Sequence, residues 1–460
     1  MYRVWNFLAN YSLLLILGAL IALVWANVSP DSYHHFVEYP LLDHSFIGHP
    51  HYGPDGEVEY RTLTLHYLIN DVLMAFFFAI AAKEVWEAII LKNGSLRGKK
   101  AATPLVATLG GMIGPIAVYL GLAAFLGSDV YDAVARGWAI PTATDIAFSY
   151  LVGRLVFGAG HPAVRFLLLL AIADDAGGLI ILAIFYPSGA LAPLWLLVSL
   201  GAALSVFILA NWLPRYLDRG KEARPNSTWI RNTLGFWPYA IAGAVSWYAF
   251  QESGIHPALG LLPIVVTIPH ADRAFGIFSE AEQYLTDLLN HIEHILKHPV
   301  EIVLFFFGLL NAGVEFSAIS EPTWLVLAGL LIGKPVGILL FGWFAAQILK
   351  LGLPKGMRMI DLFVIGCVAA IGFTVALFVA SVAFPGGPVQ DAAKMGALLS
   401  FGAAIISVIL VIYPVLPTPA CVMESPKKIM RLGPSFLNEL NEVPKINKRQ
   451  ISCFFIGLIV

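Results

Sequence analysis

Residues 137–148 read GWAIPTATDIAF, and this stretch decides how the rest of the sequence is interpreted. It lies inside a long apolar run, yet Pro141 and two threonines directly precede the carboxylate Asp145. A proline inside a helix removes a backbone donor and clashes with the preceding turn. We therefore expect a helix that is interrupted at Asp145, with helix ends and a carboxylate at the same depth.

The composition places this stretch in a membrane protein. The chain has 460 residues, 58% of them hydrophobic and 13% charged, with a mean hydropathy of +0.77. Too little polar surface remains to cover a water-soluble globule of this size. The formal net charge of -2 also argues against nucleic acid as a partner, because binding to its phosphates needs concentrated patches of Lys and Arg.

Apolar runs long enough to cross a bilayer recur along the chain. A spanning helix needs about 20 mostly apolar residues, since no water is present to satisfy an open backbone. By this criterion the sequence predicts an all-α membrane protein with twelve spans, which are residues 11–28, 67–91, 102–126, 134–157, 162–186, 190–212, 235–250, 255–269, 299–318, 323–349, 359–383 and 391–416.

The basic residues give the expected orientation. Almost all Lys and Arg fall in loops on the side of the N-terminus, and Arg61, Arg136 and Lys394 are those on the other side. By the positive-inside rule both termini are expected in the cytoplasm. The domains expected are a twelve-span unit, residues 1–416, and a basic C-terminal tail, residues 417–460. A turn-like Gly-Pro-Asp-Gly followed by alternating residues predicts a β-hairpin in the external loop 50–66.

Four ionisable residues lie in the middle of expected spans. These are Asp145, Asp174, Asp175 and Lys334, in spans four, five and ten. Because a charge at bilayer depth is costly, such residues are candidates for a functional site. Adjacent side chains on a helix point about 100° apart, so one of Asp174 and Asp175 can meet Lys334 while the other faces ions. The alternative is an ion pair that only holds the helices together.

The eleventh span has a comparable weak point. It carries Gly372 and Thr374, and both this span and the fourth have a threonine four residues before a phenylalanine. Spans three to five and ten to twelve run in opposite directions, so the two triples would form an inverted repeat with a broken middle helix. Transporters of this design bind ions near the midplane.

These residues suggest a competition between sodium ions and protons. Na⁺ requires several oxygen ligands, which Asp145, Asp175, Thr144 and open backbone carbonyls can supply, whereas a proton needs one carboxylate. Binding of one cation therefore excludes the other. Three other classes of membrane protein also have buried ionisable residues. An intramembrane aspartyl protease lacks its motifs here, a buried Lys argues against an open cation channel, and a cation or solute symporter stays open as the alternative. No enzyme activity and no cofactor are expected.

At these positions the chain resembles the NhaA family of bacterial sodium/proton antiporters. The matching blocks cover residues 68–78, 137–148, 171–175, 253–256, 311–314, 332–335 and 371–374. The resemblance implies an electrogenic antiporter of the inner membrane that exports sodium, with lithium as a further candidate ion. It also implies a homodimer formed through the hairpin of the first external loop.

The resemblance further assigns roles to single residues. It implies ion binding by Asp145, Thr144 and Asp175, and a buried acid–lysine pair, Asp174 and Lys334, that takes part in proton exchange. A pH-sensing cluster at the cytoplasmic mouth would comprise Glu84, His256, Glu293 and His294. The family usually has Glu-Val-Lys-Arg-Glu at the position of Glu84, whereas this chain has Glu-Val-Trp-Glu-Ala preceded by Lys83.

Overall fold

The structure is a computed structural model, and it describes residues 13–53, 58–91, 96, 98–158, 160–219, 225–269 and 288–412. All of these residues belong to one compact unit, Met1–Ile412. The expected tail, residues 417–460, and the turn at 54–56 lie outside the described residues.

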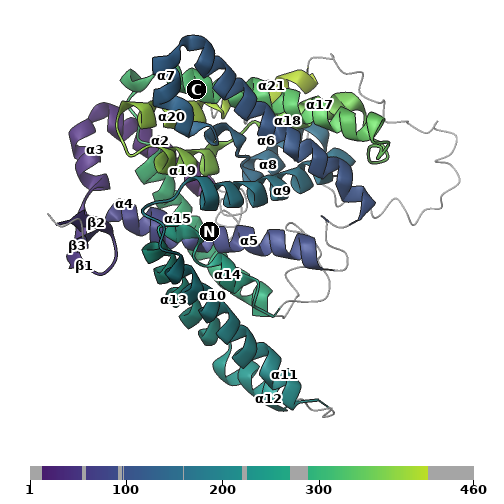
Figure 1. Ribbon diagram of the computed structural model, residues 1–460. Coiled ribbons are helices and arrows are strands. Elements are labelled where there is room, and N and C mark those ends of the chain that lie inside the picture. Colours follow the sequence, from purple (N-terminus) through teal and green to yellow (C-terminus); the bar gives the residue numbers. More distant parts are fainter. Residues whose placement is uncertain are drawn as a thin grey trace, which may run out of the picture. The chain divides into compact units, whose positions relative to one another are not determined.

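Helices make up most of the described chain, and one small sheet lies near its beginning (Figure 1). The α-helices of the first half are α2 (Leu13–Val28), α3 (Pro30–Val37), α4 (Leu65–Tyr67), α5 (Met74–Ile90), α6 (Lys99–Leu126), α7 (Ser128–Val134), α8 (Ile146–Phe157), α9 (Pro162–Phe185), α10 (Pro193–Val206) and α11 (Leu213–Leu217). Those of the second half are α12 (Pro225–Trp229), α13 (Trp237–Ser253), α14 (Leu262–Val265), α15 (Leu288–Asn311), α16 (Glu321–Ala328), α17 (Lys334–Trp343), α18 (Met359–Ala369), α19 (Phe373–Ala383), α20 (Pro388–Leu399) and α21 (Gly402–Ile412).

Six helical stretches among the described residues are long and apolar enough to cross a membrane. They are Leu65–Ile90, Ala101–Leu126, Pro162–Phe185, Pro193–Leu217, Glu321–Ile348 and Pro388–Leu410. The bent pair α18 and α19 would make a seventh if it counts as one span.

The remaining expected runs correspond to shorter, broken or more polar helices. The fourth run divides before α8, and the eighth is not one helix but the 3-10 turn η6 (Pro257–Leu259) followed by the short α14. The ninth run belongs to α15, which begins earlier than expected, at Leu288. Proline and glycine in these runs explain the divisions, because they weaken helix continuity.

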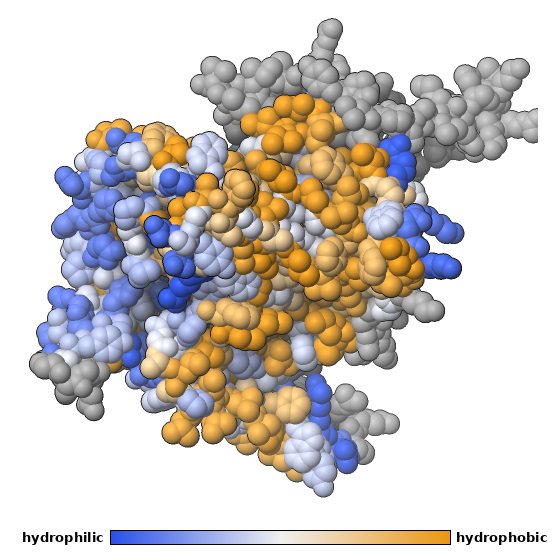
Figure 2. Space-filling model, turned by 45° about the horizontal axis from the view of Figure 1, so that its top comes forward, coloured by the Kyte–Doolittle hydropathy of each residue, from blue (hydrophilic) through white to orange (hydrophobic). Residues whose placement is uncertain are grey.

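The surface is apolar over much of the molecule. Hydrophobic residues cover a broad part of the face in Figure 2, with hydrophilic residues gathered towards its edges. Large apolar side chains such as Phe125 and Leu194 are 90% and 76% exposed. In water such a surface would be an aggregation hazard, whereas in a bilayer it faces lipid tails.

Close glycine contacts hold α6 against α17. Gly110 and Gly114 on α6 face Gly333 and Gly337 across the crossing, so each helix presents a Gly-x-x-x-Gly face. A Cβ atom on Gly337 would overlap the backbone carbonyl of Gly110. Small residues of this kind allow two helix backbones to approach in a membrane. The contact fixes the position of Lys334, which lies on α17 between the two glycines.

The loop after α3 forms a three-stranded antiparallel sheet. Its strands are β1 (Pro40–Ser45), β2 (His49–Tyr52) and β3 (Val58–Thr64), in the order β1-β3-β2. The pairs His49–Thr62 and Pro50–Arg61 set the register of β2 and β3. Arg61 also makes a 2.9 Å ion pair with Glu252 on α13, which ties the sheet to the helices.

Candidate ion-binding site

The chain is not α-helical where the sequence predicts an interruption before Asp145. Residues Ile140–Thr142 form the 3-10 turn η3, and α8 begins only at Ile146. Asp145 caps α8, because its Oδ1 accepts a hydrogen bond of 3.2 Å from the Phe148 backbone N–H. A carboxylate at this position satisfies an amide that the helix leaves open and lies at the positive end of the helix dipole.

A second break separates α18 from α19. The two helices are bent by 54° at residues 370–372. A Cβ atom on Gly372 would come within 3.1 Å of the Ala143 carbonyl oxygen, so a glycine allows the two breaks to approach each other. The Gly372 N–H donates to the Ser400 hydroxyl over 3.2 Å, which satisfies one amide of the break.

The two breaks are joined by direct hydrogen bonds. The Asp145 N–H donates to the Ile371 carbonyl over 2.8 Å, and the Thr144 hydroxyl donates to the Ala369 carbonyl over 3.2 Å. In the other direction, the Thr374 hydroxyl and the Thr374 N–H both donate to Asp145 Oδ2, the N–H over 3.3 Å. The buried Asp145 carboxylate therefore lies between the N-terminal ends of α8 and α19, where helix dipoles favour negative charge.

A buried ion pair lies near the point where the two helix breaks meet. Lys334 Nζ is 2.9 Å from Asp174 Oδ2, and the exposed fractions of the two side chains are 0% and 1%. Lys334 Nζ also donates to the Thr142 carbonyl oxygen in the first break. The pair thus links α9, α17 and the break, and it satisfies two charges that would be costly if either were alone.

Asp175 shares a small pocket with Asp174 but also faces a larger space that Asp174 does not line. It lines a cavity of about 230 Å³ together with Thr144, Asp145 and Thr374. The structure therefore brings the three predicted ion-binding residues and one predicted break residue to a single cavity. Pro141 lies in η3, where its side chain packs near Gly329 of the adjoining helix.

The same cavity is lined by Glu84 and Glu293, two of the four residues assigned to pH sensing. Glu293 also makes a 2.7 Å ion pair with Lys83, which makes a second pair of 3.0 Å with Glu87. Lys83 is 3% exposed at its side chain. Basic charge is thus present beside Glu84 although the usual Lys-Arg pair is missing.

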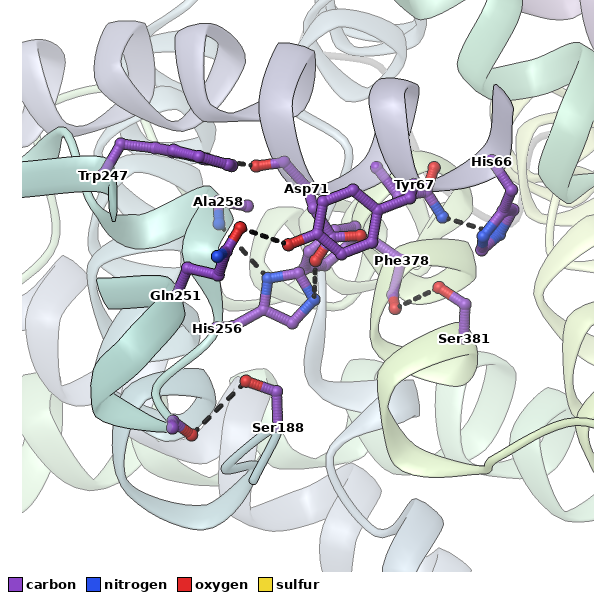
Figure 3. Close-up of polar contacts among 12 residues, drawn as sticks. His66, Tyr67, Asp71, Ser188, Trp247, Gln251, His256, Ala258, Phe378 and Ser381 are labelled. Carbon is purple, nitrogen blue, oxygen red and sulfur yellow. Dashed lines mark hydrogen bonds and ion pairs between the residues drawn. The ribbon is translucent and has the colours of Figure 1, made fainter. Parts of the chain in front are cut away.

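The two histidines of the expected cluster lie elsewhere. His294 is exposed and does not line the cavity. His256 lies beside Asp71, with 3.6 Å between Nε2 and Oδ1, and its ring makes an edge contact with Phe378 at 5.0 Å between centroids (Figure 3). The Ala258 N–H donates to His256 Nδ1 over 3.3 Å, so Nε2 is the nitrogen that carries a proton towards Asp71.

Sequence reasoning missed Lys83 and Glu87 as a pair, and also Asp71 and Glu301. The spacing of four residues between Lys83 and Glu87 in an apolar helix could have indicated the first pair. Glu301 lies two residues after Pro299, inside the expected ninth span, so the rule that selects ionisable residues in expected spans would have selected it as well. The Lys83–Glu293 contact had no local signal, because the two residues are 210 positions apart.

Oxygen atoms dominate the chemistry of this site. Among the described residues, no group of three or more His, Cys, Asp and Glu side chains could hold a metal ion. A hard monovalent cation would therefore need hydroxyl or carbonyl oxygens besides Asp145 and Asp175, and Thr144 and Thr374 line the cavity with both carboxylates.

Comparison with known proteins gives a consistent result. Residues 4–412 match the family model described as Na+/H+ antiporter 1. The Na(+)/H(+) antiporter NhaA of Jannaschia sp. strain CCS1 is 76% identical over 409 residues, which are 89% of this chain and 97% of that protein. Those of Desulfitobacterium hafniense and Geobacter sulfurreducens are 47% and 42% identical, over 87% and 88% of this chain and 94% and 96% of theirs.

Proposed function

Because this chain belongs to the Na+/H+ antiporter 1 family, whose NhaA members are transporters and not enzymes, we propose that it exchanges sodium ions for protons across the bacterial inner membrane. One observation carries the mechanism. The Asp145 carboxylate is held at the crossing of two helix breaks and faces the same cavity as Asp175.

Competition for these carboxylates couples the two ions. When Asp145 and Asp175 are ionised, they bind Na⁺ together with oxygens such as that of Thr144. When protons bind, the carboxylates lose the charge that attracts the metal ion, so the sodium ion leaves. Since the site holds sodium or protons but not both, it carries each in a separate half of the cycle.

Lys334 and Asp174 supply the charge balance of this cycle. Asp174, the acidic member of the ion pair, is next to Asp175 on α9, so a change in charge at one carboxylate is felt by the other. In the sodium-free state the Lys334–Asp174 pair has no net charge. If Lys334 releases its proton, that proton becomes one of those exchanged for sodium. We propose on this basis that transport is electrogenic and that more protons enter than sodium ions leave.

The arrangement in the membrane follows the same proposal. Twelve membrane spans with cytoplasmic termini agree with the distribution of Lys and Arg. The spans that are broken before α8 and between α18 and α19 would be the middle helices of the two halves of an inverted repeat. Glu84 and Glu293 are then placed to sense pH from the cavity, with His294 and His256 acting from outside it. The sheet β1–β3 would join two copies into a homodimer.

The test is a sodium pulse given to everted vesicles that contain the protein and an imposed pH gradient. Sodium should collapse the gradient, and Asp175→Asn should abolish the collapse because an amide cannot exchange a metal ion for a proton. Asp132→Asn, an exposed aspartate outside the cavity, is the matched control and should behave as the parent. Normal exchange by Asp175→Asn would remove Asp175 from the site, and a collapse that needs an added solute would indicate a symporter.

A further inference from the structure

Glu301 places another carboxylate in the wall of the ion-binding cavity. It lies on α15, two residues after Pro299, and is 8% exposed. It lines the cavity of about 230 Å³ that also contains Asp145 and Asp175. A buried ionisable side chain is costly unless it has a partner, so Glu301 is a candidate for a functional role.

The carboxylate is not satisfied by the protein around it. Within the described part of the chain, Glu301 Oε2 is buried and has no hydrogen-bond partner. A buried carboxylate oxygen without a donor costs several kcal/mol, and a bound cation or proton removes that cost. The unsatisfied oxygen therefore indicates a ligand, and the cavity is the space from which a ligand can reach it.

The charges around Glu301 favour a cation. The other ionisable residues lining the cavity are Glu84 on α5, Asp145 at the start of α8, Asp175 on α9, and Glu293 and Lys297 on α15. Lys297 lies one turn before Glu301 and is the basic member of this set. The acidic excess attracts cations into a narrow, low-dielectric space.

The position of Glu301 along α15 suggests how it acts. It follows Glu293 by two helical turns, about 12 Å along the axis. Passages for ions use several weak sites in succession, so that an ion can enter and still leave. Glu301 would supply such a site between Glu293 and the Asp145–Asp175 pair.

We propose that Glu301 is an additional cation-binding carboxylate on the path between Glu293 and the Asp145–Asp175 site, and that it sets the apparent affinity for sodium. This inference rests on the proposed sodium/proton exchange. It concerns how sodium reaches the site and not the exchange at Asp175.

Sodium kinetics in everted vesicles test this role. Glu301→Gln keeps the shape and removes the charge, so the KM for sodium should rise by about fivefold or more, with the maximal rate within about twofold of the parent. Glu301→Asp should restore most of the affinity. The matched control is Glu321→Gln, at an exposed glutamate outside the cavity, which should leave KM unchanged.

A labelling experiment tests the position independently of transport rates. In a background with Cys367, Cys421 and Cys453 replaced by Ser, Glu301→Cys should react with a cationic methanethiosulfonate reagent, and sodium should slow the reaction. An unchanged KM in Glu301→Gln, or labelling that sodium does not affect, would overturn the inference. If the parent itself shows no sodium-driven proton movement, the proposed function fails instead, whatever Glu301 does.

Discussion

Asp174 differs from Asp175 in what it contacts, although the two are neighbours in sequence. Asp174 is paired with Lys334, whereas Asp175 lines the cavity with Asp145. Adjacent residues on a helix point in different directions, so a pair of acids can divide two tasks. This division leads to separate expectations for the two residues.

Asp174→Asn should change coupling and pH dependence more than sodium affinity. It leaves the buried Lys334 without its counter-charge, which costs about 3–5 kcal/mol in comparable pairs, so the melting temperature in detergent should fall. The double variant Asp174→Asn with Lys334→Gln removes both charges and should recover most of that stability. An unchanged pH profile in Asp174→Asn would favour a purely structural ion pair.

Thr374→Val should weaken sodium binding. The hydroxyl of Thr374 donates to Asp145 Oδ2 and lies in the wall of the cavity, so its loss removes an oxygen and a bond that orients the carboxylate. We expect the KM for sodium to rise roughly tenfold, equivalent to about 1.4 kcal/mol. Thr374→Ser keeps the hydroxyl and should retain near-parental affinity. Equal kinetics in the two variants would count against a role for this oxygen.

At the scale of elements, the site depends on helices that stop. A continuous helix at residues 140–145 or 370–372 would use its amides internally, and Asp145 could not accept from Phe148 and Thr374 at once. Pro141 and Gly372 are visible in the sequence, so the two weak points could be predicted locally. That the breaks meet could not, because residues 145 and 374 are 229 positions apart.

Gly337→Ala should destabilise the protein by disturbing the close contact between α6 and α17. The new Cβ atom would overlap the Gly110 carbonyl, and forcing α6 away from α17 should cost about 1–3 kcal/mol. Gly121→Ala, on the same α6 but with no atom near the added Cβ, is the matched control and should be neutral or slightly stabilising. Thermal unfolding in detergent would compare the two. Equal melting temperatures would show that the crossing tolerates separation.

At the scale of the whole molecule, a membrane potential should drive the exchange. If unequal charges cross in each cycle, every 100 mV contributes about 2.3 kcal/mol per net charge moved. In proteoliposomes whose potential is set by potassium and valinomycin, the rate of sodium-driven proton movement should depend on the sign of the potential. A rate independent of the potential would establish electroneutral exchange.

The sheet should hold two copies together. Deleting residues 50–59, which include most of β2 and the start of β3, should convert a dimer into a monomer in light-scattering measurements in detergent. Because the cavity is lined by α5, α8, α9, α15 and α19, exchange by the shortened protein should continue. A dimer that survives the deletion would place the interface elsewhere.

The sequence alone determined the helical membrane class, the charged residues within apolar runs and the two weak points. Composition, hydrophobic run length, and proline or glycine in a helix act locally, so each can be read from neighbouring residues. The sequence also predicts one continuous helix where there is none. Residues 255–269 are expected to form a single span, but they contain a 3-10 turn and a short helix.

Only the tertiary structure decided which groups meet. Asp145 accepts hydrogen bonds from Thr374, and Lys83 forms an ion pair with Glu293. His256 lies beside Asp71 and does not line the cavity that contains Glu84. These contacts depend on how helices from distant parts of the chain pack, through features such as the glycine crossing of α6 and α17. Periodicity along one helix shows which face a residue occupies, but the residue opposite that face belongs to another helix, and packing alone selects it.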